Sequence, residues 1–303
     1  MSCWPLLRLA MPGRVVCRLC RALMWALLAG SLIVGCGGSG SSHNPGRRQP
    51  ASINRLIARV MNPVDPPATP RARVWQFRDV NFHAVIADAG SPLGFVMFAT
   101  TRRDVTVTRD SAAIIRALVT EPARFASQRD ERHWKAQGSP PVADGTRSLE
   151  VLHVPAGTFG FAPQGLPLTV RSIQTMHASA QQIDHQIATA LTETNPLPSQ
   201  LLRQYGFLLG TAPLSPALRR AMLAAVVALP GLHTCGMSRD QLGRLGEGFC
   251  EGGSATSIRL LIDPTTGVAL AVEEYLIKPS RLFPGVPVGR LVESDTFVIG
   301  AES

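Results

Sequence analysis

Histidines are the residues of this sequence best suited to acid–base or metal chemistry, and its seven are scattered along the chain. A zinc site built on one helix uses two histidines four residues apart, and no pair in this sequence has that spacing. Asp184 and His185 are adjacent, which on a helix directs their side chains about 100° apart, so they do not predict a catalytic dyad. The sequence therefore predicts no metal and no cofactor. The histidines are His43, His83, His133, His153, His177, His185 and His233.

The sequence motifs of common enzyme classes are also absent. The chain contains no His-Glu-x-x-His, no Gly-x-Ser-x-Gly and no Gly-x-x-x-x-Gly-Lys, and no dinucleotide fingerprint follows a predicted strand. The run Asp263-Pro264-Thr265-Thr266-Gly267 has oxygen atoms that could suit calcium, but proline followed by glycine is more typical of a β-turn. We therefore expect no catalytic residues and no enzymatic activity, while an enzyme of unrecognised type stays as a minor alternative.

Two cysteines in the C-terminal part could form a disulfide. The residues around Cys235 and Cys250 read as a hairpin, with a strand over 231–236, a polar turn over 237–243 and a return strand over 245–250. The midpoint between the cysteines falls inside this turn, so the two can lie opposite each other. We predict a Cys235–Cys250 disulfide, which in the chain-entropy model adds about 3 kcal/mol for a loop of about 15 residues. Two unpaired buried cysteines are the alternative.

The N-terminal 35 residues have the layout of an export signal. Four arginines and no acidic residue precede or begin an apolar run over residues 22–34. A helix of these residues is about 20 Å long, short of the roughly 30 Å needed to cross the hydrocarbon core of a membrane. The sequence favours a cleaved signal over a transmembrane anchor. Met1, Met11 and Met24 all stay open as the true start.

The end of this segment, Ile33-Val34-Gly35-Cys36, resembles the lipobox of bacterial lipoproteins. The resemblance implies cleavage before Cys36, diacylation of its sulfur, and a lipid-anchored protein on the extracytoplasmic face of the cell membrane. A signal cleaved elsewhere is the alternative. The glycine- and serine-rich residues 37–50 then form a flexible tether. We expect three regions: signal peptide 1–35, tether 36–50 and an envelope domain 51–303, with a possible division into 51–165 and 166–303.

The net charge does not indicate nucleic-acid binding. The whole chain has 30 basic and 21 acidic residues, for a formal charge of +9, and the four arginines of residues 1–35 contribute part of this excess. The remaining 26 basic residues face 21 acidic ones, and no recognised nucleic-acid-binding motif accompanies them. We therefore expect no nucleic-acid partner.

The first half of the predicted domain mixes helix and strand. Apolar spacing predicts a helix over 53–61, capped by Ser52, and another over 111–119. Short β-rich runs separated by turn residues predict strands over 74–77, 82–87, 95–99, 105–108 and 148–154. Residues 125–136 are ambiguous, and residues 139–145 form a loop.

The second half has a clearer order. Apolar periodicity predicts helices over 177–191, 199–209 and 216–229, the last with Ser215 as N-cap and Pro216 at its first position. The hairpin and further strands over 257–262, 268–277 and 290–299 follow, joined by short turns. The sequence predicts an α+β fold in which helices cover one face of an antiparallel β-sheet.

Residues 195–278 resemble a family of uncharacterised actinobacterial envelope proteins. The resemblance is carried by the run 213–222, by Leu229-Pro230-Gly231, by Asp240 with Gly243-Arg244, and by 262–267. It supports the fold and an envelope origin, and it implies no activity. In that family apolar residues usually stand where this chain has its two cysteines, so the disulfide is predicted from the local pattern alone.

Two functions are compatible with this sequence. A membrane-anchored interaction or sensor module would bind another envelope protein through an exposed sheet edge or a helix face. Alternatively, an apolar cavity between sheet and helices would carry a lipid or another apolar ligand. We favour the first, because good folding patterns occur here without catalytic residues.

Overall fold

The computed structural model of the chain describes residues 74–87, 94–140, 149–161, 168–176, 179–190 and 196–300. All of them belong to one unit, which comprises residues 49–303. The predicted signal, the Ile33–Cys36 motif, the tether and the helix over 53–61 lie outside the described residues. None of the helices described is both long and apolar enough to cross a membrane.

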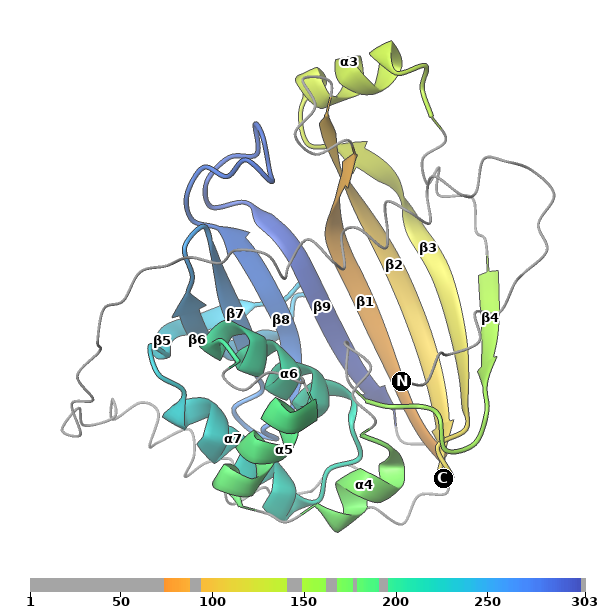
Figure 1. The fold of residues 1–303 in the computed structure, drawn as a ribbon, viewed down its shortest axis with the longest axis vertical. Coiled ribbons are helices and arrows are strands. Elements are labelled where there is room, and N and C mark those ends of the chain that lie inside the picture. Colours follow the sequence, from red (N-terminus) through yellow and green to blue (C-terminus); the bar gives the residue numbers. More distant parts are fainter. Residues whose placement is uncertain are drawn as a thin grey trace. The chain divides into compact units, whose positions relative to one another are not determined.

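The described strands form one antiparallel sheet of nine strands in the order β4-β3-β2-β1-β9-β8-β7-β6-β5. Strand β9 pairs with β1 and joins the early strands to the later ones (Figure 1). Together with the helices this makes an α+β fold, as the sequence predicted. The strands are β1 (Val74–Ala87), β2 (Phe95–Thr108), β3 (Ala113–Phe125), β4 (Leu149–Val154), β5 (His233–Arg239), β6 (Leu245–Gly252), β7 (Thr256–Ile262), β8 (Ala269–Leu276) and β9 (Leu291–Gly300).

Strands β1 and β2 are continuous, whereas the sequence predicted two short strands in place of each. The polar residues in the middle of β1 and of β2 were interpreted as turns between two short strands. They are instead paired across the sheet, since Asp79 of β1 lies opposite Arg103 of β2 and forms an ion pair with it. Asn81 of β1 donates a hydrogen bond of 2.7 Å to Asp295 of β9. Polar pairs between strands thus replace the apolar alternation on which the prediction relied.

The helix predicted over 111–119 is wrong, because these residues begin strand β3. A tight turn after β2 puts Ser111 at φ 61°, and the chain returns antiparallel to β2 with Val105 opposite Ile115. The β-branched residues Ile114 and Ile115 favour a strand at this position. The ambiguous stretch 125–136 contains helix α3 (Gln128–Ala136), whose N-cap Ser127 accepts a hydrogen bond from the Asp130 amide.

The remaining helices are α4 (Val170–Thr175), α5 (Ala180–Ala190), α6 (Pro198–Thr211) and α7 (Pro216–Ala228). The sequence predicted α5, α6 and α7 with boundaries within a few residues, and it did not predict α4. Ser215 caps α7 as expected, accepting a hydrogen bond of 3.2 Å from the Leu218 amide. Helix α6 lies against β6–β9, and α5 and α7 pack on α6 and on each other (Figure 1).

Helix α6 approaches the sheet closely because it carries two glycines on the contacting side. A Cβ atom on Gly206 would lie 2.2 Å from Cγ2 of Val272, and one on Gly210 would lie 2.2 Å from Cδ2 of Phe297. Buried side chains of α6, such as Tyr205 and Leu209, complete this contact and belong to the main hydrophobic core. Burial of such side chains contributes about 1.5–3 kcal/mol each.

The C-terminal strands follow the sequence prediction closely. Each of β5 to β9 lies within a few residues of its expected range, and all neighbouring pairs are antiparallel. The run 263–267 is a turn between β7 and β8, in which Asp263 accepts from the Thr265 amide at 2.8 Å and Gly267 has φ +68°.

Candidate functional site

Strand β4 forms one edge of the sheet. It pairs with β3 through six residue pairs without a register shift, and no other described strand pairs with its second side. Its residues 150–153 are exposed, and the apolar side chains of Val151 and Leu152 retain 43% and 53% of their surface in solvent. Leu152 lies opposite Ile115, which packs on the main core, so Leu152 and Val151 point to opposite faces. The edge is therefore regular and exposes one apolar side chain on each face, beside Glu150 on one face and His153 on the other.

Strand β5 forms the other edge and is irregular. Cys235 and Cys250 are joined by a disulfide with a Cα–Cα distance of 5.8 Å. The register with β6 shifts between Thr234 and Gly236, and Gly236 has φ +82°. His233, not Cys235, lies directly opposite Cys250, and Cys235 is the residue without a partner at the register shift, so the disulfide runs diagonally between the strands.

The turn between β5 and β6 is held by one buried carboxylate. Asp240 accepts hydrogen bonds of 2.9 and 2.8 Å from the amides of Leu242 and Arg244, and one of 2.7 Å from Nε of Arg244. Arg244 also donates to the Leu270 carbonyl at 3.0 Å. This fixes the tip of the hairpin against strand β8.

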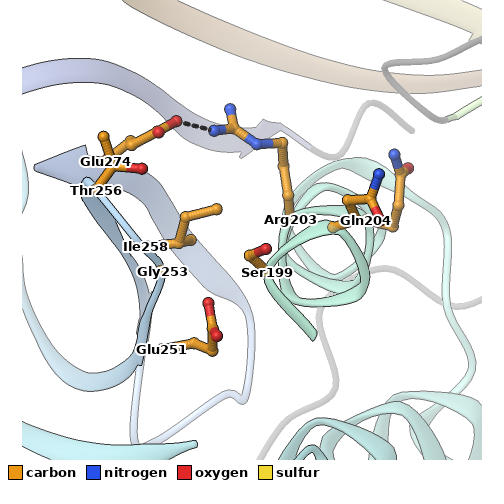
Figure 2. A pocket seen from close by; sticks show the side chains of 9 residues that line it. Ser199, Arg203, Gln204, Glu251, Gly253, Thr256, Ile258 and Glu274 are labelled. Carbon is orange, nitrogen blue, oxygen red and sulfur yellow. Dashed lines mark hydrogen bonds and ion pairs between the residues drawn. The ribbon is translucent and has the colours of Figure 1, made fainter. Parts of the chain in front are cut away.

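A pocket lies between α6 and the ends of β6, β7 and β8, and it is small and polar. Its volume is about 200 Å³. Arg203 of α6 reaches across it to Glu274 of β8, while Glu251 and Ser199 lie at the opposite side (Figure 2). Oε2 of Glu251 is buried without a hydrogen-bond partner among the described residues, and its burial raises the pKa of this carboxyl. This is not the apolar cavity that the carrier hypothesis expected between sheet and helices.

Arg203 joins this pocket to a row of charges on the same face of the sheet. Its guanidinium contacts Glu274 at 2.5 Å and Glu293 at 2.8 Å, and Asp295 lies near enough to stabilise its charge as well. Burial raises the pKa of Glu293 despite this arginine, and the neighbouring Asp295 and Glu274 raise it further. The row is therefore short of positive charge.

Asp79 continues the row on β1. Its carboxyl is fully buried, and burial together with the charge of Asp295 raises its pKa to about 7, although Arg103 opposes the shift. His83 follows on the same face, and burial lowers its pKa while Asp295 acts in the opposite direction. Asp79 therefore titrates near neutral pH. Asp79, Glu274 and Glu293 each form an ion pair with an arginine through one oxygen, which makes the row a structural network. Oδ1 of Asp79 is buried without a hydrogen-bond partner among the described residues.

The histidines considered as candidate metal ligands lie on different elements of the structure. The five that are described, His83, His133, His153, His185 and His233, lie on β1, α3, β4, α5 and β5 respectively. His43, His177 and Cys36 lie outside the described residues. The described part of the chain contains no group of three His, Cys, Asp or Glu side chains able to hold a metal.

Asp184 does not act as a partner of His185. It accepts a hydrogen bond from the hydroxyl of Tyr205, a core residue of α6. Burial and this bond raise the pKa of Tyr205. The bond ties α5 to α6, so Asp184 has a structural contact in place of a catalytic one.

Sequence reasoning predicted strand β4 but did not identify it as an edge. The order of strands depends on pairing between residues far apart in the chain, above all β1 with β9, and no local pattern records it. The exposed Val151 and Leu152 resembled ordinary strand residues. No local sign marked β4 as an edge, because the strand carries the charged Glu150 beside the apolar Val151 and Leu152, as many paired strands do.

The chain thus folds as an α+β domain whose sheet has a regular edge at β4 and an irregular edge at β5, where a disulfide joins β5 to β6. No family model and no curated protein sequence matches it. The structure of the Pseudomonas aeruginosa MucA/MucB complex is similar at a TM-score of 0.30 and 16% identity, over 84% of this chain and 59% of that chain. A crystal structure of MucB gives a TM-score of 0.25 and 16% identity, over 81% and 55%. This chain therefore spans less than two thirds of either, and likeness at these scores supports no conclusion on fold or function.

Proposed function

We propose that this domain is a non-enzymatic protein-interaction module of the cell envelope, which binds an extended segment of a partner protein as an added strand beside β4. The observation that carries the proposal is the regular edge of β4, which exposes the apolar side chains of Val151 and Leu152 on opposite faces. The anchor that would hold the module at the membrane is the lipid on Cys36, which the signal sequence predicts.

Backbone groups at a free sheet edge supply most of the affinity in strand addition. In an antiparallel pair alternate residues direct their N–H and C=O groups toward the partner strand, so half of the residues of β4 direct theirs away from β3. No described strand accepts them. A six-residue edge is about 20 Å long, which matches a short extended peptide.

Side chains on both faces of β4 would select the partner. Leu152 projects on the face that carries the main core, and Val151 and His153 project on the other. An added strand would therefore place apolar side chains beside Leu152 on one face and beside Val151 on the other. Glu150 adds a negative charge at the start of this edge, which favours a basic residue on the partner.

The carrier alternative has less support. The pocket between α6 and the sheet is small, and Arg203, Glu251 and Glu274 line it. An apolar ligand would have to remove these groups from water or from one another, which is unfavourable.

Site-specific photo-crosslinking in cells tests the proposal. A photoreactive residue is placed at position 151, at 152 and, as control, at 237 on β5, whose native Met237 is 50% exposed. Because neighbouring strand residues point to opposite faces, an added strand gives the same product from 151 and from 152. Docking on one face gives a product from only one of them. Identical products from 151 and 152, absent at 237, support the proposal. A product made of two copies of this chain, or the same product from 237, contradicts it.

The lipid anchor is tested separately. The intact mass of the mature protein should equal residues 36–303 plus acyl chains, less two daltons for the disulfide. Cys36→Ser should abolish incorporation of labelled palmitate. Retention of the signal at full size, with no palmitate in either form, contradicts the anchor and leaves the β4 interaction untouched.

A further inference from the structure

A second pocket lies on the face of the sheet opposite to α6. Its volume is about 490 Å³, within the range of ordinary ligand sites. On β1 it is lined by Val80 and Phe82, which alternate with the core residues Trp75 and Phe77 and so point away from the helices. Phe98 and Thr100 of β2 face it in the same way.

The hairpin turn closes this pocket on one side. Gln241 and Leu242, at the tip between β5 and β6, line it together with β1 and β2, although four strands separate β5 from β1 in the sheet. The sheet is therefore curled toward this face. The bonds of Asp240 to the Leu242 and Arg244 amides fix the tip, so this wall is formed before any ligand binds.

The floor of the pocket is aromatic. The rings of Phe82 and Phe98 stack with centroids 5.2 Å apart and an interplanar angle of 11°. Phe125 of β3 adds a third ring to the lining, and Leu242 lies 48% exposed at the tip. Phe98 keeps 6% of its surface exposed at the floor, so most of the apolar surface open to a chain or ring comes from Phe82, Phe125 and Leu242 around it.

The charged groups that line this pocket are arginines. Arg290 precedes β9, and its guanidinium lies over the Phe98 ring, 5.3 Å from the centroid. Its backbone is fixed, because its carbonyl accepts from the Leu276 amide at 2.9 Å. Arg124 also lines the pocket, and no Asp or Glu is among the lining residues. Among the described carboxylates, none forms an ion pair with Arg290.

We propose that this pocket binds a single-chain amphiphile with one anionic group, whose carboxylate or phosphate contacts Arg290 and whose apolar chain lies on Phe82, Phe98 and Leu242. A guanidinium is the preferred partner of such anions, since it offers paired donors and holds its charge at every physiological pH. The site is independent of the β4 edge and goes beyond the protein-interaction role.

Photolabelling of the full chain tests this site. The probe is a twelve-carbon carboxylic acid with a diazirine on its chain, and the labelled residues are mapped by mass spectrometry. We expect saturable labelling of peptides containing Phe98 or Leu242. The matching twelve-carbon alcohol should need about ten-fold higher concentration, because it lacks the charge. Equal labelling by acid and alcohol, or labelling that does not saturate and spreads over the surface, overturns the proposal.

Two pairs of variants locate the contacts. Arg290→Gln should raise the half-saturating concentration of the acid about ten-fold and leave that of the alcohol unchanged. Arg281 is an exposed arginine of the same loop outside the pocket lining, so Arg281→Gln should have no effect.

The second pair tests the hairpin tip. Leu242→Asp puts a like charge at the rim and should reduce labelling by the acid at least as much as Arg290→Gln does. Leu245 is equally exposed on the same hairpin, and Leu245→Asp should leave labelling unchanged. Unchanged labelling in both Arg290→Gln and Leu242→Asp overturns the proposal.

Competition separates the two sources of such an amphiphile. Free dodecanoate that displaces the probe while phosphatidylglycerol vesicles do not indicates a soluble fatty-acid-like ligand. Displacement by these vesicles, and not by phosphatidylcholine vesicles, indicates an anionic membrane lipid. Failure of both competitors contradicts a specific anionic site.

Discussion

The two edges of the sheet meet the same physical problem in different ways. A strand at an edge exposes backbone groups that can pair with another chain, and proteins commonly protect them. At β5 the register shifts, a disulfide joins the strand to β6, and a buried aspartate fixes the turn. At β4 none of these devices is present among the described residues, and Val151 and Leu152 are exposed. This difference between the two edges is the reason why we propose β4, and not β5, as the strand beside which a partner strand is added.

Loss of the disulfide should produce the largest effect. Removing it in the Cys235→Ser/Cys250→Ser double variant should lower the free energy of unfolding by about 3 kcal/mol, because the unfolded chain gains conformational freedom. Urea denaturation measures this. Hydrogen exchange should also accelerate in β5 and β6 and stay unchanged in β4. Equal acceleration of exchange in β4 and in β5 would show that the disulfide does not stabilise its own edge selectively.

A lysine at the open edge should remove binding. Leu152→Lys introduces a charge that edge strands use against pairing, so crosslinking to the partner should fall at least ten-fold, or about 1.4 kcal/mol. The free energy of unfolding should change by less than about 0.5 kcal/mol, since the side chain is exposed. Met237→Lys on β5 is the matched control and should leave the partner bound. A loss of binding in both variants would mean that the edges are equivalent.

A change of pH should alter the stability of the whole domain and not that of one edge, because the row of charges lies on the central strands β1, β8 and β9. The pKa of Asp79 is raised to about 7 in the folded state, so its contribution to stability is lost as the pH rises through 7. The free energy of unfolding should increase when the pH falls from 8 to 6.5, by at most about 1.4 kcal/mol per pH unit for this one proton.

Asp79→Asn should remove most of that slope. Below about pH 6.5 the lowered pKa of His83 acts in the opposite direction, because the unfolded chain then takes up a proton that the folded chain does not. His83→Gln is the control for this part of the curve. A slope from pH 8 to 6.5 that is unchanged in Asp79→Asn would exclude the carboxyl as its origin.

Val151→Thr should give the smallest effect. Threonine preserves the β-branched shape and removes apolar contact worth less than about 0.8 kcal/mol, so partner binding should weaken no more than about four-fold. Binding assays that use purified partner can resolve this. A loss as large as that of Leu152→Lys would show that one face of β4 alone determines recognition.

The sequence was informative where a local pattern decides the structure. Ser215 and Pro216 mark the start of α7, and the turn at Asp263 has the residues that its backbone requires. It was misleading where distant residues decide. Asp79 and Asn81 resemble a loop until Arg103 and Asp295 are placed beside them, and residues 113–119 resemble a helix until β2 lies alongside.

The candidate sites show the same limit. Strand β4 was predicted as a strand, but its place at the edge follows from the pairing order of the whole sheet. The pocket at Arg290 depends on the curl that brings Leu242 over β1 and β2. Neither the edge position of β4 nor the pocket at Arg290 can be predicted from the residues of one segment.

The ion pair between Asp79 and Arg103 also has a consequence for how the chain folds. The long hairpin of β1 and β2 could in principle pair one position out of step, which would turn every side chain to the wrong face. In such a misaligned form Asp79 would no longer lie opposite Arg103, and a buried carboxylate would lose its counter-ion. The ion pair thus makes the misaligned pairing of β1 with β2 less stable than the native pairing.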